Sequence, residues 1–170
     1  MTVANIYTVA FQGIEAREVD VQVHIGDGGN GGIFNVVGLG DKAVAESRER
    51  VRAALSAIGL AMPYKRVTVN LAPADLPKEG SHYDLPIALG LLAAMGVLPA
   101  SELANYVALG ELSLDAQLTP VAGVLPAALA ASEAHRGLIC PAACGPEAAW
   151  AGGLEIIAAP SLIAIVNHMK

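Results

Sequence analysis

The chain has 170 residues and a formal net charge of −6, with 54% hydrophobic and only 15% charged residues. This length favours one domain that buries its own core. The negative charge argues against a whole surface that binds nucleic acid, although a local basic patch stays open. Apolar runs are short and interrupted by glycine and proline, so none reaches the roughly 18 residues of a membrane span. We expect a single domain over residues 1–170 and no membrane partner.

The cysteines and histidines do not form a metal-site pattern. Cys140 and Cys144 lie in a run of alanine, proline and glycine, and the four histidines are scattered. Because a zinc site needs a second pair of such ligands, we expect buried thiols and no metal or other cofactor in this chain. Low cysteine content and the lack of a signal peptide favour a cytoplasmic protein.

The first third of the chain is predicted to form strands. Alternating valines indicate antiparallel strands at 2–12 and 17–25, joined at Gly13. The glycine-dense stretch 26–32 then leads to a third strand at 33–37, and its turn residues predict a long hairpin loop. This stretch lacks the Gly-Lys-Ser/Thr ending of a phosphate-binding loop and precedes a strand instead of a helix, so we expect no nucleotide there.

The spacing of the apolar residues then changes from that of a strand to that of an amphipathic helix at 41–58. Asp41 is its predicted N-cap, and Gly59 is predicted to end it. The Asp41 carboxylate is a better occupant of this helix terminus than an anion. A strand at 66–71 and a loop at 72–80 follow.

An apolar helix is predicted at 84–95, with Pro86 in its first turn, where the missing N–H does no harm. The second half of the chain alternates strands and helices. The strands are predicted at 106–114, 118–121, 137–140 and 154–158, and the helices at 125–133, 146–150 and 161–169. These elements predict an α/β fold of the α+β two-layer sandwich type, a mixed sheet with helices packed mainly on one face.

The helix at 41–58 carries the densest positive charge of the chain. Its basic residues are Lys42, Arg48, Arg50 and Arg52. Glu46 with Arg50 and Glu49 with Arg52 have the spacing of intrahelical ion pairs, which is typical of a solvated face. Arg48 and Arg52 are the less neutralised pair, so a contact with phosphate or an acidic partner stays open.

The segment 77–84 places Lys78, Ser81, His82 and Asp84 close together in sequence, as a hydrolase constellation would. Catalytic triads are assembled from distant segments, because neighbours on an extended chain point apart. The pattern Ser81-x-x-Asp84 before an apolar helix is better interpreted as a helix cap.

Three strings carry a resemblance to a known family. They are VGLGDKAVAESRERVRAAL at 37–55, RVTVNLAPADLPKEGSHYDLPIALGLLAA at 66–94 and GELSLDAQLTPVAGVLPAALAA at 110–131. The chain resembles the N-terminal domain of the ComM/YifB family of magnesium-chelatase-like AAA+ ATPases from near Met1 to the last helix. Gly40 stands where the family has proline.

The resemblance implies a fold of the Lon-protease-domain and ribosomal-protein type, and a longer protein in which the ATPase domain follows this N-terminal fragment. ATP and Mg are implied only for that downstream domain, which is also this chain's expected partner. The intact family protein is implied to be a hexamer that acts on branched DNA in natural transformation.

The same kinship permits a test for peptidase chemistry. By position, His82 stands where Lon-type peptidases have the serine nucleophile and Leu125 where they have the lysine. Both members of the dyad are therefore missing, and Ser81 would need another partner such as Lys78.

We expect a non-catalytic accessory domain that supports a DNA-remodelling motor, and no enzyme activity in this chain itself. The alternatives are a cryptic Ser-Lys-type peptidase and a small nucleic-acid-binding module. The residues expected to contact a partner or nucleic acid are Lys42, Arg48, Arg52, Asp75, Lys78, Glu79 and Ser81.

Overall fold

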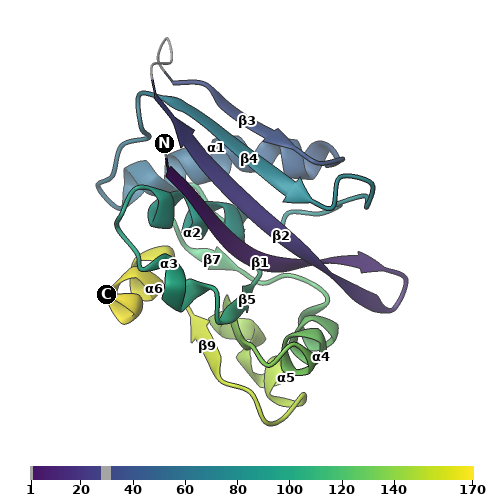
Figure 1. Cartoon of the computed structure of the whole chain (residues 1–170). Helices are drawn as coiled ribbons and strands as arrows, with labels where there is room; N and C mark the ends of the chain where they lie inside the picture. The colour runs from purple at the N-terminus through teal and green to yellow at the C-terminus, as the bar shows by residue number, and fades with distance from the viewer. Residues whose placement is uncertain (1, 28–31) are drawn as a thin grey trace.

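A seven-stranded mixed sheet lies at the centre of the chain, in the order β3-β4-β2-β1-β5-β8-β9 (Figure 1). The computed structural model describes residues 2–27 and 32–170. The strands of this sheet are β1 (Thr2–Gln12), β2 (Glu15–Gly26), β3 (Phe34–Val37), β4 (Arg66–Ala72), β5 (Tyr106–Ala108), β8 (Gly137–Pro141) and β9 (Ile156–Ala159). A separate two-stranded hairpin contains β6 (Glu111–Leu112) and β7 (Leu118–Thr119). The helices are α1 (Lys42–Ala57), α2 (Asp84–Ala94), α3 (Ala100–Leu103), α4 (Val124–Glu133), α5 (Gly145–Ala149) and α6 (Leu162–Met169).

The hairpin predicted between the second and third strands is wrong. β4 lies between them, antiparallel to β2 and parallel to β3. The glycines suggested that the third strand would fold back directly against the second. Instead, the alternating apolar residues of β4 are buried in the same core, and β4 pairs with β2. Residues 28–31 of the predicted loop lie outside the described residues.

Helices α1 and α2 cover one face of β1, β2 and β4, and lie behind these strands in Figure 1. Val19, Val21 and Val23 alternate along β2 and point into this core. Every residue of α2 is buried, because the helix is held between the sheet, α1 and the β6–β7 hairpin. The expected α/β class, a mixed sheet with helices packed mainly on one face, is confirmed.

A second, smaller core lies under α4 and α5. Neighbouring residues of β8 belong to different cores: Leu138 and Cys140 pack with α4 and α5, whereas Ile139 packs with the larger core. All of β8 is therefore buried. On the second face, helices cover the C-terminal strands and the part of β1 and β2 next to their turn.

The strand predicted at 106–114 is wrong in its length. β5 ends at Ala108, and after Gly110 the chain enters β6, which belongs to the separate hairpin. The backbone at this break is held by other segments, because Leu109 N–H donates to Ile139 O and Gly110 N–H to His82 O. The short helix α3 was also missed by the sequence patterns.

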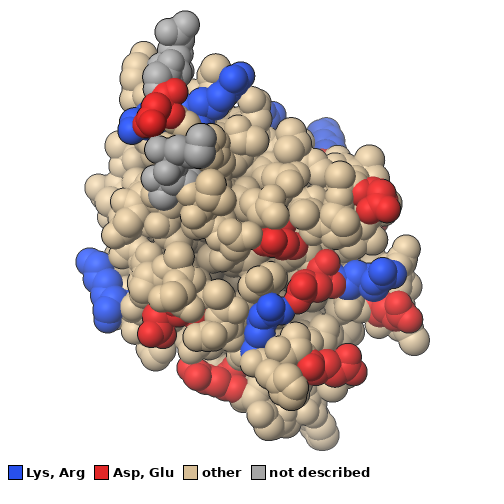
Figure 2. All heavy atoms as spheres, in the orientation of Figure 1, with Lys and Arg blue, Asp and Glu red and all other residues tan. Residues whose placement is uncertain are grey.

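The other face of β1, β2 and β4 carries a ladder of polar side chains, and α4 packs on it only toward the β1–β2 turn (Figure 1). Asn5 Nδ2 donates to Asp20, Gln22 Nε2 donates to Asp20, and Asn70 Nδ2 donates to Gln22. Figure 2 shows this side of the molecule with blue and red groups scattered over a mostly tan surface. Among the described residues, no helix is long and apolar enough to cross a membrane.

Gly90 is the point where α2 lies closest to the sheet. A Cβ atom there would lie 2.6 Å from Val23 Cγ2 and 3.3 Å from Ile6 Cγ1. We expect Gly90→Ala to lower the free energy of unfolding by about 1–3 kcal/mol, because overpacking outweighs the gain in helix propensity. Urea denaturation measures the change.

The control is Gly90→Ala combined with Val23→Ala, which removes the clashing methyl groups. This double variant should lose less stability than the two single changes predict together. A Gly90→Ala protein as stable as the wild type would contradict the close packing described for α2.

Candidate functional site

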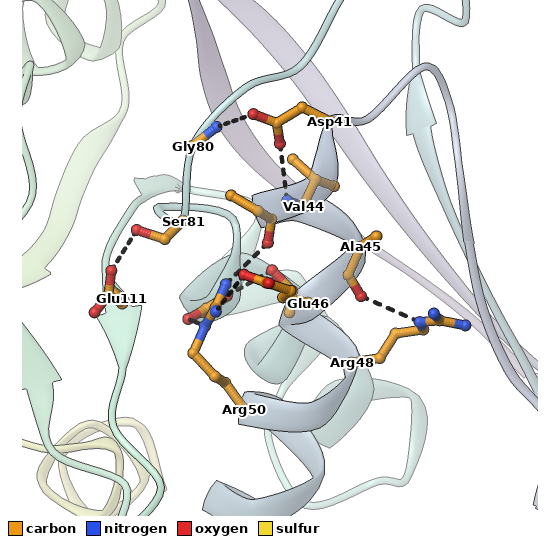
Figure 3. A network of polar contacts seen from close by, with 12 residues as sticks. Asp41, Val44, Ala45, Glu46, Arg48, Arg50, Gly80, Ser81 and Glu111 are labelled. Atoms are coloured by element: carbon orange, nitrogen blue, oxygen red, sulfur yellow. Dashed lines mark hydrogen bonds and ion pairs between the residues drawn. The ribbon is translucent and has the colours of Figure 1, made fainter.

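The turn before α1 and the loop before α2 form one structure at the end of the sheet. Asp41 caps α1 by accepting from Val44 N–H at 2.9 Å, and its second oxygen accepts from Gly80 N–H at 3.2 Å (Figure 3). Asp41 N–H donates to Lys78 O, and Lys78 N–H donates to Leu39 O. The predicted cap is confirmed, and it also attaches the loop at 78–80 to the helix.

Lys78, expected as a contact residue, has a fully buried side chain. Its Nζ donates to Gly38 O at 2.6 Å and to Pro73 O. Burial lowers the pKa of this amine below its ordinary value. Since its hydrogens are directed at backbone carbonyls, Lys78 ties the turn at Gly38 to the loop and is not exposed to a partner in this conformation.

The predicted Ser81-x-x-Asp84 cap is wrong. The N-cap position of α2 is Tyr83, and it makes no side-chain hydrogen bond to the helix. The Ser81 hydroxyl donates instead to the Glu111 carboxylate of β6, and Ser81 O accepts from Asp84 N–H (Figure 3). The residues have the right spacing for a cap, but each side chain has a better partner in another segment.

Asp84 is the centre of a buried polar network that the sequence did not reveal. Its carboxylate is fully buried and accepts from Arg50 Nε at 2.6 Å and Arg50 Nη2 at 3.1 Å. Ser47 Oγ at 2.5 Å and Leu112 N–H at 3.0 Å complete the set. Burial raises the pKa of Asp84, while these donors oppose that change; Asp84 in turn raises the pKa of Arg50.

The role of Arg50 also differs from the expected solvated face. Its pair with Glu46 is present at 3.6 Å, but its strongest contact is the bidentate one with Asp84 from α2. The signal in the sequence was the acidic residue at the start of an otherwise apolar helix, because a buried carboxylate requires a partner. No local pattern distinguishes Arg50 from the other three basic residues of α1 as that partner.

His82 is buried between aromatic rings. Its centroid lies 5.2 Å from that of Phe11 and 4.1 Å from that of Tyr83. Nε2 lies 2.7 Å from Val9 O, and because a carbonyl only accepts, Nε2 carries the proton. Burial lowers the pKa of His82, so the ring is neutral at pH 7.

A cavity of about 350 Å³ lies beside this loop. Its lining residues are Phe11, Glu79, Gly80, Ser81, His82, Pro120, Val121 and Ala122. The walls are mainly apolar, and Glu79 is exposed at the loop. The cavity therefore has room for a small apolar group next to a carboxylate.

The geometry brings Ser81 and His82 to one cavity but does not form a nucleophile with its base. Ser81 is hydrogen-bonded to a carboxylate, and Lys78 is bonded to carbonyl oxygens. Leu125 contributes an apolar side chain, while its N–H donates to Glu147 Oε2 at 2.9 Å. None of these contacts supplies the amine or imidazole that would take the Ser81 proton.

The cysteines are both buried and free. Burial raises the pKa of Cys140 to about 12, so its thiol is protonated at neutral pH and is a poor metal ligand. Within residues 2–27 and 32–170, no three histidine, cysteine or acidic side chains are grouped as they would be around a metal ion.

The basic residues of α1 are not equivalent. Arg48 donates to the backbone oxygens of Ala45 and Phe34. Lys42 and Arg52 are exposed, and in the described part of the chain neither makes an ion pair or a side-chain hydrogen bond. Of the three expected contact residues of α1, these two are the more accessible.

Comparison with known proteins identifies the family. A family model for the subunit ChlI of magnesium chelatase matches residues 21–144. The competence protein ComM of Haemophilus influenzae is 43% identical over 170 residues, which are 100% of this chain and 33% of ComM. The chain belongs to the ComM/YifB family of magnesium-chelatase-like proteins.

Other members of the ComM/YifB family match in the same way. YifB of Escherichia coli is 44% identical over 139 residues, 82% of this chain and 27% of YifB. A Mycobacterium tuberculosis protein is 41% identical over 157 residues, 92% of this chain and 31% of that protein. The chain thus spans about a third of the length of these relatives.

The span that matches the ChlI model contains both α1 and the loop before α2. Asp75 and Glu79 of this loop are exposed, Ser81 is half-buried and Lys78 is buried. In this ComM/YifB domain, the accessible charged side chains of the loop are therefore acidic, whereas α1 exposes the basic Lys42 and Arg52 beside the acidic Glu46 and Glu49.

The environment of His82 predicts a pH effect on stability. Because its pKa is lowered in the folded state, the unfolded chain binds a proton more readily, and stability is lost as the pH falls below about 6.5. We expect the difference in unfolding free energy between wild type and His82→Gln to rise with pH up to this value and then stay constant. Chemical denaturation from pH 4.5 to 8 measures it.

The matched control is His168→Gln, because His168 is exposed near the end of α6. This variant makes the same chemical change at the surface and measures the effect of the substitution itself. An equal pH dependence for the two variants would contradict the burial of a neutral His82.

Proposed function

We propose that this chain is a non-catalytic interaction domain of a longer magnesium-chelatase-like ATPase. The proposal rests on one observation: the side chains that could take part in chemistry are already held in structural contacts. Asp84 is held by Arg50 and Ser47, and Ser81 is held by Glu111. With these groups engaged, the exposed loop and the outer side of α1 are the surfaces that we assign to this interaction.

The proposal places ATP and Mg in another part of the protein. At the N-terminus of α1 the Asp41 carboxylate occupies the position that a phosphate would need. The first turn of α2 begins with buried Asp84, which repels an anion. These two helix starts therefore do not fit a nucleotide phosphate, and the partner that we infer is the protein's own ATPase domain.

The exposed acidic residues Asp75 and Glu79 are the contacts that we assign to that partner. They belong to a loop whose backbone is attached to α1 through Asp41 and Lys78. A loop held in this way presents its charges with little loss of conformational entropy on binding. The name of the competence protein ComM supports a role in competence, and we infer that the motor of the intact protein acts on DNA.

The first test uses the intact protein. We expect Ser81→Ala to leave ATP hydrolysis and branched-DNA processing within about twofold of wild type, since its hydroxyl makes only a part-buried hydrogen bond. Asp75→Lys combined with Glu79→Lys should lower DNA processing by about fivefold, because reversing contact charges costs on the order of 1 kcal/mol.

The control is Glu102→Lys, which reverses an exposed charge on α3, away from the loop. It should behave like wild type. Loss of activity in a folded Ser81→Ala protein would favour the peptidase alternative, and a normal double variant would remove the loop from the interaction.

A second candidate function is nucleic-acid binding through α1. It is favoured by exposed Lys42 and Arg52, which have no intramolecular charge partner in the described part of the chain. The face shown in Figure 2 has no continuous blue patch, so this contact would be confined to the helix behind the sheet. A contact of this kind is sequence-independent and weakens with salt.

If α1 binds DNA, Lys42→Ala with Arg52→Ala should weaken binding of all duplex sequences alike. The slope of log affinity against log salt should fall by about 2, because two phosphate contacts are lost. Fluorescence anisotropy with labelled duplexes at several salt concentrations measures both effects. Arg17→Ala, at the hairpin end of β2, is the control, and wild-type chain without salt-dependent binding would exclude this function.

A further inference from the structure

A groove of about 480 Å³ lies between the β1–β2 turn and α4. Its residues are Ile14, Glu15, Ala16, Leu125, Pro126, Leu129, Ala130 and Glu133. None of these belongs to the loop before α2 or to α1. The groove is therefore separate from the surfaces discussed above.

The groove carries exposed apolar side chains at a turn, a place that is usually polar. Ile14 is 94% exposed, the largest exposure among the large hydrophobic residues described, and Leu129 is 48% exposed. Leu125, Leu129 and Glu133 are spaced four residues apart and form one stripe along α4. An isoleucine left in water at a turn, facing such a stripe, is typical of a contact surface.

The rim of the groove is acidic. Glu15 lies beside Ile14 and Glu133 lies at the end of the α4 stripe, and no basic side chain is among the described residues that line the groove. The matching ligand is an apolar or aromatic group that projects from a surface and has basic neighbours.

The chain itself contains such a group. Tyr64 is 83% exposed in the segment before β4, and the next residues, Lys65 and Arg66, are both exposed. Lys65 makes a surface ion pair of 3.6 Å with Asp27, and Arg66 beside it is a second exposed cation. Tyrosine and arginine are both enriched at the centres of protein interfaces, and a tyrosine can bury its ring while its hydroxyl stays in water.

The two features lie at opposite ends of β2. Arg66 pairs with Gly26 at one end of the strand, whereas Glu15 begins it beside the turn of Ile14. Eleven residues of extended strand separate these ends by roughly 35 Å. In Figure 1, β2 runs from the hairpin at the right to the upper left. One copy of the chain therefore cannot place its own Tyr64 in its own groove.

We propose that Tyr64 of one copy inserts between Ile14 and Leu129 of a second copy, with Lys65 and Arg66 facing Glu15 and Glu133. The two surfaces are different, so the contact is head-to-tail. Each added copy leaves one groove and one Tyr64 unoccupied, which allows a ring or a longer row instead of a closed pair. The contact does not depend on the proposed function of the loop.

The test measures self-association of the chain by sedimentation velocity over a range of concentrations. We expect wild type to form species larger than a dimer, more weakly as salt rises. Ile14→Ser and Tyr64→Ser should each weaken association at least about tenfold, because each removes one side of the contact centre. Both residues are exposed, so neither change should affect folding.

Mixing the two variants gives the decisive result. The Ile14→Ser chain keeps its Tyr64, and the Tyr64→Ser chain keeps its groove, so together they should form one-to-one dimers. These dimers should grow no further, because the groove left at one end and the Tyr64 position left at the other are both damaged. Trp150→Ser, which removes another aromatic side chain that is 83% exposed, should associate like wild type.

Three outcomes would overturn the proposal. The first is a wild-type chain that stays monomeric at all concentrations, which would leave the groove to a different partner. The second is unchanged association of both single variants, and the third is a mixture that associates no more than its components. The Asp75→Lys and Glu79→Lys variant of the loop tests the proposed function, and its result has no bearing on self-association through Tyr64. Either proposal can therefore fail without the other.

Discussion

The buried Asp84 carboxylate is the interaction on which the arrangement of this domain depends. It receives hydrogen bonds from two side chains of α1 and from the backbone of β6, and it lies in the first turn of α2. Removing one partner of such a buried pair typically costs about 3–5 kcal/mol, because the remaining charge is left uncompensated. Three elements far apart in the sequence therefore keep one relative position, and the loop before α2 keeps its place against the turn before α1.

The same network explains why the residues that resemble a hydrolase do not form one. Ser81 is drawn to Glu111 because β6 is held close to the start of α2 by the Asp84 contact with Leu112 N–H. Lys78 turns inward because Gly38 O and Pro73 O both accept hydrogen bonds from its Nζ. The polar side chains thus stabilise a loop geometry, and the surface charges are left for recognition.

The sequence predicted what depends on neighbouring residues and missed what depends on distant ones. The strands at 2–12 and 66–71, the α1 helix and its Asp41 cap follow from periodicity and local hydrogen bonding. The place of β4 between β2 and β3 was missed, because glycine content describes a turn but not the strand that returns beside it. The Ser81 cap failed for the same reason, since a local pattern cannot weigh a partner thirty residues away.

The length of β1 and β2 also separates the exposed apolar side chains at the two ends of these strands. β1 and β2 pair along 11 residues, so their turn lies far from the end where β4 begins. The polar ladder of Asn5, Asp20 and Gln22 lies between these ends and satisfies its own hydrogen bonds. A surface whose polar groups are already paired gains little from a partner, which directs contacts toward the two ends. Ile14 and Tyr64 are exposed at these ends, and a contact that buries them removes apolar area from water.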